Sequence, residues 1–208
     1  METKVLLVRH GETDWNRELR CQGHKDVPLN DGGLRQAHDL AERLGSLPLA
    51  AVYSSDLQRA LVTARTVAGP RRLSMTPLTA LRERYMGQWE GLTLEDRRRR
   101  WPHLHVFWEQ GERHVAGVNM EPYEDLTKRL WQVVNDAAKS HPGQTILMVT
   151  HGGCVACLLD GLGVPRSERG PFLRNCAVSP LVVGGAGWRL DGDFLRESAR
   201  GGRGEAAV

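Results

Sequence analysis

Two short apolar runs in this chain each lead into a histidine. The run at 4–8 leads into Arg9 and His10, and the run at 145–150 leads into His151. Runs of this length bounded by polar residues suit strands that are buried on both faces of a sheet. Imidazole can act as a nucleophile or base, and an adjacent guanidinium matches the oxygens of phosphate or carboxylate. The pattern therefore indicates a site for an anionic substrate.

The two histidines, His10 and His151, are predicted to meet at one edge of the sheet. In a parallel sheet joined by right-handed crossovers, the carboxyl ends of both strands lie at the same edge, which is where open α/β sheets bind ligands. Gly11 allows the backbone after His10 to turn sharply and to approach a ligand closely. A lone histidine is more often a structural residue, so the repeated setting is what favours a shared site.

Two further charged residues, Arg59 and Glu83, could serve this site. Arg59 falls in the first turn of a predicted helix, where free backbone amides already favour anions, so a cation there is out of place unless an anion binds nearby. A solvated surface arginine is the alternative. Glu83 lies in a loop between Arg82 and Arg84, and a salt bridge to either of them is the alternative to a chemical role.

The apolar pattern predicts the elements that would position these side chains. Short strands are expected at 50–53 and 73–76, and a closing hairpin at 181–183 and 188–190. One helix is expected over 31–44, with Asn30 or Asp31 as its cap, and a second begins after a cap at Ser55 or Asp56. A third helix begins at a capping box formed by Thr93 to Asp96, and a fourth is expected over 122–140. Four consecutive arginines at 97–100 are spread around their helix, which favours a solvated face.

The regular pattern is interrupted at 101–119, where tryptophan and phenylalanine stand among polar residues. We expect a lid or helical insertion over about 93–120, and we expect it to govern substrate choice. A single domain is expected over 1–195. Residues 196–208 carry little apolar content, which is typical of a loosely held tail.

Composition excludes several classes of partner. The 208 residues suffice to bury about 70% of the unfolded surface. A net charge of +3 with interspersed charges requires neither nucleic acid nor a membrane surface. Neither a signal-peptide core nor a run long enough to span a bilayer is found, so a cytoplasmic protein is expected.

The four cysteines are too few and too scattered for a disulfide framework, so reduced thiols are expected. Cys154 and Cys157 form a CxxC motif, but a zinc site would need two more ligands at matching spacing. The surrounding segment has the pattern of a buried helix, and helix packing is the favoured interpretation of the pair.

Taken together, the motifs resemble those of the histidine phosphatase superfamily, the phosphoglycerate mutase-like proteins. The resemblance extends from Val5 to about Leu190 and rests on five segments in the family's order: LVRHGETDWN at 7–16, QG at 22–23, SSDLQRALVTA at 54–64, LRERYMGQWEG at 81–91 and VTHGG at 149–153. It implies a three-layer αβα sandwich with a mostly parallel central sheet and a helical insertion after the third strand.

The resemblance also implies roles for the catalytic residues. His10 would attack phosphorus and carry the phosphoryl group, while Arg9, Arg59 and His151 would surround the phosphoryl oxygens. Glu83 would protonate the leaving alcohol and then take a proton from water. His10 must be neutral to attack, with an acceptor holding its second N–H. His151 is expected to be cationic with an anion bound and less firmly charged in the empty site.

Further substrate-binding positions follow from the same resemblance. Asn16 and the backbone amide of Gly152 would be phosphate ligands, Gly11 would approach the ligand, and Thr13, Gln22 and Gly23 would form the rim of the pocket. No metal ion is required, because arginines supply the positive charge.

The shared motifs fit both phosphatases and mutases, and a phosphatase of small phosphorylated metabolites is the favoured function. One alternative is a cofactor-dependent phosphoglycerate mutase, which would need 2,3-bisphosphoglycerate. The other is a phosphatase of narrow substrate specificity, such as α-ribazole phosphatase. Mutases follow the glutamate with Arg-His-Tyr-Gly, whereas residues 84–87 here are Arg-Tyr-Met-Gly. Similarly, residues 119–122 are Asn-Met-Glu-Pro where many family phosphatases have Gly-Gly-Glu-Ser.

The same assignments bear on the cofactor, on the class of protein and on its assembly. A phosphatase implies no resident cofactor. A non-catalytic phosphate-binding module would lack His10 or Glu83, and both residues are present. The oligomeric state is open, with a homodimer as an alternative to a monomer.

Overall fold

Helices and strands alternate along the chain in the computed structural model, which describes residues 1–45, 47–104 and 117–192. The strands are β1 (Thr3–Arg9), β2 (Ala51–Ser54), β3 (Met75–Pro77), β4 (Thr145–Thr150), β5 (Val178–Gly184) and β6 (Gly187–Leu190). The α-helices are α1 (Asp14–Arg17), α2 (Asp31–Arg43), α3 (Gln58–Ala68), α4 (Leu94–Arg100), α6 (Tyr123–Ser140) and α7 (Gly152–Gly161). Short 3-10 helices span Gly69–Arg71, Thr79–Leu81, Gly87–Trp89, Arg166–Glu168 and Gly170–Leu173.

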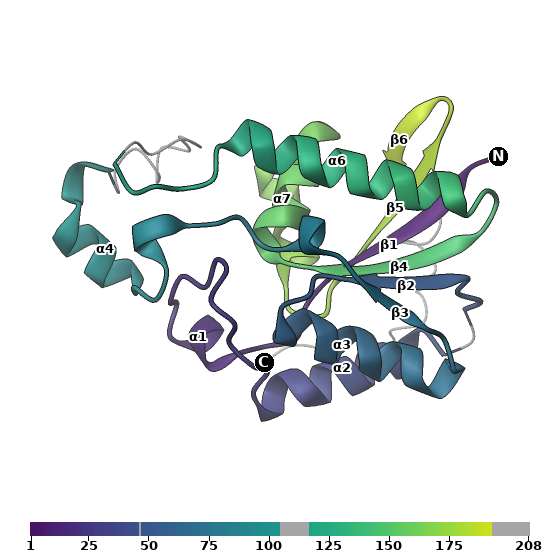
Figure 1. The fold of residues 1–208 in the computed structure, drawn as a ribbon, viewed down its shortest axis with the longest axis horizontal. Helices are drawn as coiled ribbons and strands as arrows, with labels where there is room; N and C mark the ends of the chain where they lie inside the picture. Colours follow the sequence, from purple (N-terminus) through teal and green to yellow (C-terminus); the bar gives the residue numbers. More distant parts are fainter. Residues whose placement is uncertain (46, 105–116, 193–208) are drawn as a thin grey trace.

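The strands form one sheet of six, in the order β3-β2-β4-β1-β5-β6 (Figure 1). The first four strands of that order run parallel, and β5 and β6 add an antiparallel hairpin at one side. In the register of the central pair, Val8 lies opposite Val149 and Arg9 lies opposite Thr150. The carboxyl ends of β1 and β4 therefore finish side by side.

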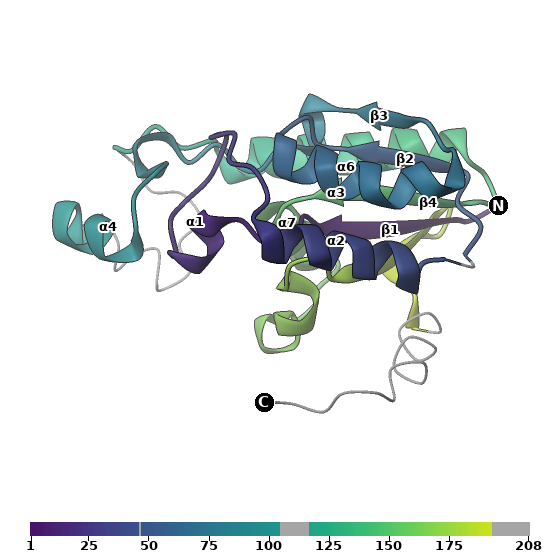
Figure 2. The same cartoon turned by 90° about the horizontal axis from the view of Figure 1, so that it is seen from below.

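Helices α2, α3, α6 and α7 form two layers, one on each face of the sheet (Figure 1). Figure 2, seen from below, shows α2 and α3 nearer the viewer than α6. Helices α6 and α7 pack on the face that receives Val5 and Leu7, and α2 and α3 pack on the face that receives Leu6 and Val8. Side chains on a strand alternate between its two faces, so one apolar strand contributes to both cores. This arrangement confirms the predicted three-layer αβα sandwich with a mostly parallel sheet.

The predicted helix starts are confirmed in two cases and wrong in one. Asn30 caps α2 by accepting a hydrogen bond from the amide of Gly33 (2.8 Å). Thr93 opens α4 with a reciprocal capping box. Helix α3 has Leu57 at its cap position, with no side-chain hydrogen bond. Asp56, one of the two predicted caps, instead accepts two hydrogen bonds from the guanidinium of Arg82, at 2.7 and 2.5 Å.

The segment after β3 contains the helix expected there, α4, which stands away from the sheet (Figure 1). Residues 105–116 of the expected lid lie outside the described part of the chain, as does the predicted tail at 196–208, so both boundaries stay predictions. Among the helices of the described ranges, none is both long and apolar enough to cross a membrane.

Candidate active site

His10 and His151 meet where β1 and β4 end, as the sequence predicts. The amide of His10 donates to the carbonyl of Thr150 (3.0 Å), which joins the two strand ends directly. The centroids of the two imidazole rings lie 5.1 Å apart, edge to face. Both side chains are buried, at 3% and 0% exposure. A pair of buried imidazoles in contact is therefore the centre of the site.

The ring of His10 is fixed in one tautomer by its own loop. Its Nδ1 lies 2.6 Å from the carbonyl oxygen of Gly11, an acceptor, so Nδ1 carries the proton and Nε2 keeps a free lone pair. Burial lowers the pKa of His10 well below 6.5, the charges of Arg59 and Arg9 lower it further, and the Gly11 hydrogen bond opposes them. The imidazole is consequently neutral at neutral pH.

Arg59 is completely buried, so the surface interpretation of this residue is wrong. Its Nη1 and Nη2 donate to the carbonyls of Lys25 (2.7 Å) and Gly23 (2.8 Å), and its Nε donates to Nδ1 of His151 (3.2 Å). Arg59 thus connects the loop after α1 to the second histidine. Because Nδ1 of His151 is an acceptor in this contact, the proton of that ring is on Nε2.

The surroundings of His151 favour its neutral form. Burial lowers the pKa of His151 well below 6.5, and the neighbouring charges of Arg59 and His10 act in the same direction. The lowered pKa is in the direction expected from the sequence, which predicts a ring that is less firmly charged when no anion is bound. A cationic His151 with an anion bound stays a prediction.

Hydrogen-bond donors beside His10 are buried without partners. Among the residues that the structure describes, Nε of Arg9 and Nε2 of His151 both lack a hydrogen-bond partner. The same guanidinium is anchored through Nη1, which donates to the carbonyl of Leu173. A buried donor left unpaired costs about 1 to 3 kcal/mol. An anion at this position would relieve that cost twice.

Glu83 is held by backbone amides. Its Oε1 accepts from the amide of Arg84 (2.8 Å) and its Oε2 accepts from the amide of Gly153 (2.9 Å), at the start of α7. Arg82, a suggested salt-bridge partner of Glu83, pairs with Asp56 instead. The carboxylate therefore has a fixed position at the wall of the cavity that His10 faces.

The cavity at this edge of the sheet has a volume of about 680 Å³. Apolar side chains form part of its wall, among them Leu19, Met86 and Leu173. Its charged lining, within the described residues, consists of seven arginines and two carboxylates: Arg9, Arg20, Arg59, Arg84, Arg97, Arg166, Arg169, Glu83 and Asp160. Such a cavity favours an anionic ligand larger than a phosphate group.

Residues 5–193 match the histidine phosphatase superfamily, branch 1. The chain belongs to this superfamily. It is 33% identical over 189 residues to "Uncharacterized phosphatase PhoE" of Bacillus subtilis (90% of this chain, 92% of the relative), and 35% identical over 201 residues to "Probable phosphoglycerate mutase GpmB" of Yersinia pestis (94% and 92%). The solved structure of Bacillus stearothermophilus YhfR is similar with a TM-score of 0.83, 33% identity and coverage of 91% and 95%.

Within this histidine phosphatase, the predicted site residues fall into two groups. Those that line the cavity are Arg9, His10, Asn16, Gln22, Gly23, Arg59, Glu83 and Gly152. His151, which contacts the ring of His10, is not among the lining residues, and neither are Gly11 and Thr13. Thr13 is not at the rim because its side chain caps α1 and accepts from the amide of Asn16. Gly11 packs against the backbone of Gly33, where an added Cβ would come within 2.5 Å of an oxygen.

The sequence patterns missed much of the distal wall of the cavity. Arg97 comes from the run of arginines expected to face solvent, and it is half-buried with its guanidinium 5.1 Å from the ring of Trp89. Tyr123 was expected only as part of an apolar stripe, yet it lines the cavity and donates to Asp160 (2.5 Å). These residues carry no local signal, because only the fold brings them together.

The CxxC pair behaves as packing residues. Cys154 and Cys157 are buried in α7 and are free thiols. Burial raises the pKa of Cys154 well above 9.0, so its thiol is protonated. In the described ranges, no group of three or more histidine, cysteine, aspartate or glutamate side chains could hold a metal ion.

Proposed function

We propose that this protein is a phosphatase of small phosphorylated metabolites that works through a phosphohistidine on His10. One observation carries the proposal: the buried ring of His10 is locked by Gly11 with its Nε2 free, beside unpaired donors of Arg9 and His151. A neutral imidazole next to unpaired buried donors suits attack on a phosphoryl group, whose oxygens those donors would bind.

In the first step Nε2 of His10 attacks phosphorus, and the bond from phosphorus to the alcohol oxygen breaks. Arg9, Arg59 and the Nε2–H of His151 stabilise the charge on the phosphoryl oxygens. Glu83, in its acid form, gives its proton to the departing alcohol. A positioned general acid contributes about 10² to 10⁴ in rate.

In the second step water attacks the phosphohistidine and the phosphorus–nitrogen bond breaks. Glu83, now a carboxylate, takes the proton of the attacking water. Inorganic phosphate leaves, and His10 returns to its neutral state with Nδ1–H still on the Gly11 carbonyl. Glu83 thus acts as an acid in the first step and as a base in the second.

The alcohol part of the substrate should carry a second acidic group. A phosphate dianion balances only part of the positive charge of the seven arginines in the cavity wall, and Asp160 already pairs with Arg169. Apolar residues such as Leu19 and Met86 would contact the carbon skeleton. A phosphorylated hydroxy acid or a sugar acid phosphate fits this combination.

The name of the Yersinia relative favours the alternative function, a phosphoglycerate mutase. In contrast, the residues that follow Glu83 in the chain favour a phosphatase. The ring of Tyr85 lies 5.3 Å from that of His24, and Met86 rather than Tyr85 lines the cavity. Arg84 is common to both patterns and lines the cavity, but Met86 stands where the mutase pattern has a tyrosine, so an apolar contact replaces a polar one at this position.

The test combines a substrate screen with trapping of the intermediate. Purified enzyme is given phosphorylated hydroxy acids, sugar phosphates and p-nitrophenyl phosphate, and phosphate release is measured for the wild type and His10→Ala. Base-quenched wild type should carry one acid-labile phosphoryl group, and His10→Ala should carry none. Equal hydrolysis by both proteins refutes the role of His10. Isomerisation of 3-phosphoglycerate that outpaces every hydrolysis would assign a mutase instead.

A further inference from the structure

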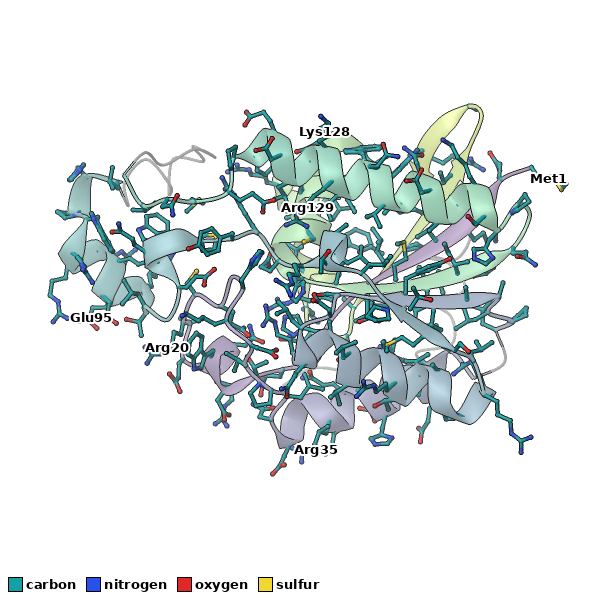
Figure 3. All side chains as sticks on the ribbon, in the orientation of Figure 1. Met1, Arg20, Arg35, Glu95, Lys128 and Arg129 are labelled. Atoms are coloured by element: carbon teal, nitrogen blue, oxygen red, sulfur yellow. The ribbon has the colours of Figure 1, made fainter. Side chains whose placement is uncertain are left out.

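Arg129 of α6 binds the backbone of the loop that carries Glu83. Its Nη1 donates to the carbonyls of Ala80 (2.8 Å) and Arg82 (2.8 Å), and its Nη2 donates to the carbonyl of Glu83 (3.1 Å). Figure 3 shows Arg129 on the inner side of α6, whereas its neighbour Lys128 points away from the molecule. One side chain therefore binds three backbone carbonyls within residues 80–83.

Glu121 holds Arg129 in this position. Oε1 of Glu121 accepts from Nε of Arg129 (2.7 Å), and Oε2 accepts from Nη2 (2.9 Å), which is the bidentate geometry that a guanidinium forms with a carboxylate. Both side chains are mostly buried, at 21% and 16% exposure. The same Oε2 accepts from the amide of Tyr85 (3.2 Å), and the amide of Glu121 donates to the carbonyl of Tyr85 (2.9 Å).

The clamp formed by Arg129 and Glu121 thus contacts the loop on both sides of Glu83. The decisive unit is the peptide group between Glu83 and Arg84. Its carbonyl oxygen accepts from Arg129 and from Nε2 of His24 (2.8 Å), and its N–H donates to Oε1 of the Glu83 carboxylate (2.8 Å). A trans peptide is rigid and planar, so fixing the carbonyl also fixes the direction of the N–H.

We propose that Arg129, held by Glu121, is a positioning residue for the Glu83 carboxylate. It acts through the peptide between Glu83 and Arg84 and touches neither substrate nor reacting atoms. The proposal rests on the role of Glu83 in the proposed function. Loss of the clamp removes Arg129 from this carbonyl and leaves His24 as its remaining donor. The peptide can then shift and weaken the Arg84 amide contact that orients Oε1 of the carboxylate. General acid catalysis should suffer more than phosphate binding.

The test measures how the rate depends on the leaving group. Values of kcat/KM report the step in which the alcohol departs, and p-nitrophenolate leaves without a proton while an alkoxide needs one. The ratio of kcat/KM for p-nitrophenyl phosphate to that for 3-phosphoglycerate is therefore a measure of the general acid. This ratio does not depend on the fraction of protein that is folded.

The variants are Glu83→Gln, Arg129→Met and the milder Glu121→Gln. Glu83→Gln should raise the ratio about 100-fold or more. Arg129→Met should raise it about tenfold or more, and Glu121→Gln should raise it by a smaller factor, since a displaced catalytic group loses most of its effect. Lys128→Met on the same helix is one control.

A second control, Arg71→Met, removes another arginine that donates to backbone carbonyls, those of Val67 and Leu44, away from the site. Both controls should leave the ratio unchanged. If Glu83→Gln leaves the ratio unchanged, the proposed role of Glu83 fails. If Glu83→Gln raises it while Arg129→Met and Glu121→Gln do not, only the positioning role is overturned.

Discussion

Gly153 is the position where a single methyl group should disable Glu83 without harming the fold. A Cβ added there would lie 2.4 Å from Oε1 of Glu83 and 3.2 Å from Oε2. The atoms it meets are the end of a side chain rather than backbone, so the carboxylate can move aside. Gly153 is also a helical residue, and alanine is favoured over glycine in helices by about 1 kcal/mol.

The size of the effect follows from the displacement. The contact must lengthen from 2.4 Å to the 3.4 Å at which ordinary contact begins, a shift of about 1 Å for Oε1. The hydrogen bond from the Gly153 amide to Oε2 (2.9 Å) is then strained or lost. A misplacement of about 1 Å costs on the order of 100-fold in rate. Gly153→Ala should therefore lose about 100-fold in kcat/KM for 3-phosphoglycerate.

The assay pairs this rate with stability. Urea unfolding should show Gly153→Ala to be as stable as the wild type or more so. Gly69→Ala is the matched control, because an added Cβ there meets nothing within 4 Å and its backbone is already helical. A wild-type rate in Gly153→Ala would refute the placement of Glu83 as general acid. A fall in rate matched by loss of folded protein would refute the local explanation.

Three further predictions concern pH, substrate and packing. Activity should persist below pH 6.5 and fall as the pH drops through the lowered pKa of His10, in a kcat/KM profile. His10 and His151 bind fewer protons in the folded than in the unfolded protein, because their pKa values are lowered by folding. The free energy of unfolding in urea should therefore fall below pH 6.5, by up to about 1.4 kcal/mol per pH unit for each histidine. His10→Ala should reduce this dependence of the unfolding free energy on pH. The kcat/KM for 3-phosphoglycerate, which has a carboxylate, should exceed that for glycerol 3-phosphate, which lacks it, by about tenfold, since a hydrogen bond to a charged group contributes about 1.5 to 3 kcal/mol. Added salt should reduce the difference between the two kcat/KM values. Gly11→Ala should lower the melting temperature, since its Cβ would press on the backbone oxygen of Gly33, whereas Gly69→Ala should not.

The sequence predicted the centre of the site because its signals are local. Two apolar strands fix their own ends, and the rules of parallel sheets then bring His10 and His151 together. The sequence could not predict that the surroundings of His151 lower its pKa, because the main cause is burial in the folded protein and the next is the charge of Arg59, 92 residues away in the chain. The clamp of Glu121 and Arg129 was missed for a similar reason. Its partners are backbone carbonyls, which every residue possesses.

Helix α3 shows the opposite error, where a local rule was followed and failed. Ser55 and Asp56 both have the residue type of a helix cap, and neither caps α3. Asp56 pairs with Arg82 instead, because an ion pair with two hydrogen bonds outweighs one bond to an amide. The predicted solvated face of the arginines at 97–100 is confirmed for the last three, which are exposed, and wrong for Arg97, whose guanidinium lies over the ring of Trp89.

The central strand β1 connects catalysis to the folding of the whole molecule. Its backbone is paired on both sides, with β4 and β5, and its side chains belong to both hydrophobic cores. Amide protons in such a strand exchange with solvent only when the whole sheet opens. The nucleophile therefore stands at the end of the strand that should open last, so partial unfolding elsewhere would displace Glu83 or the cavity wall while His10 itself stays in place.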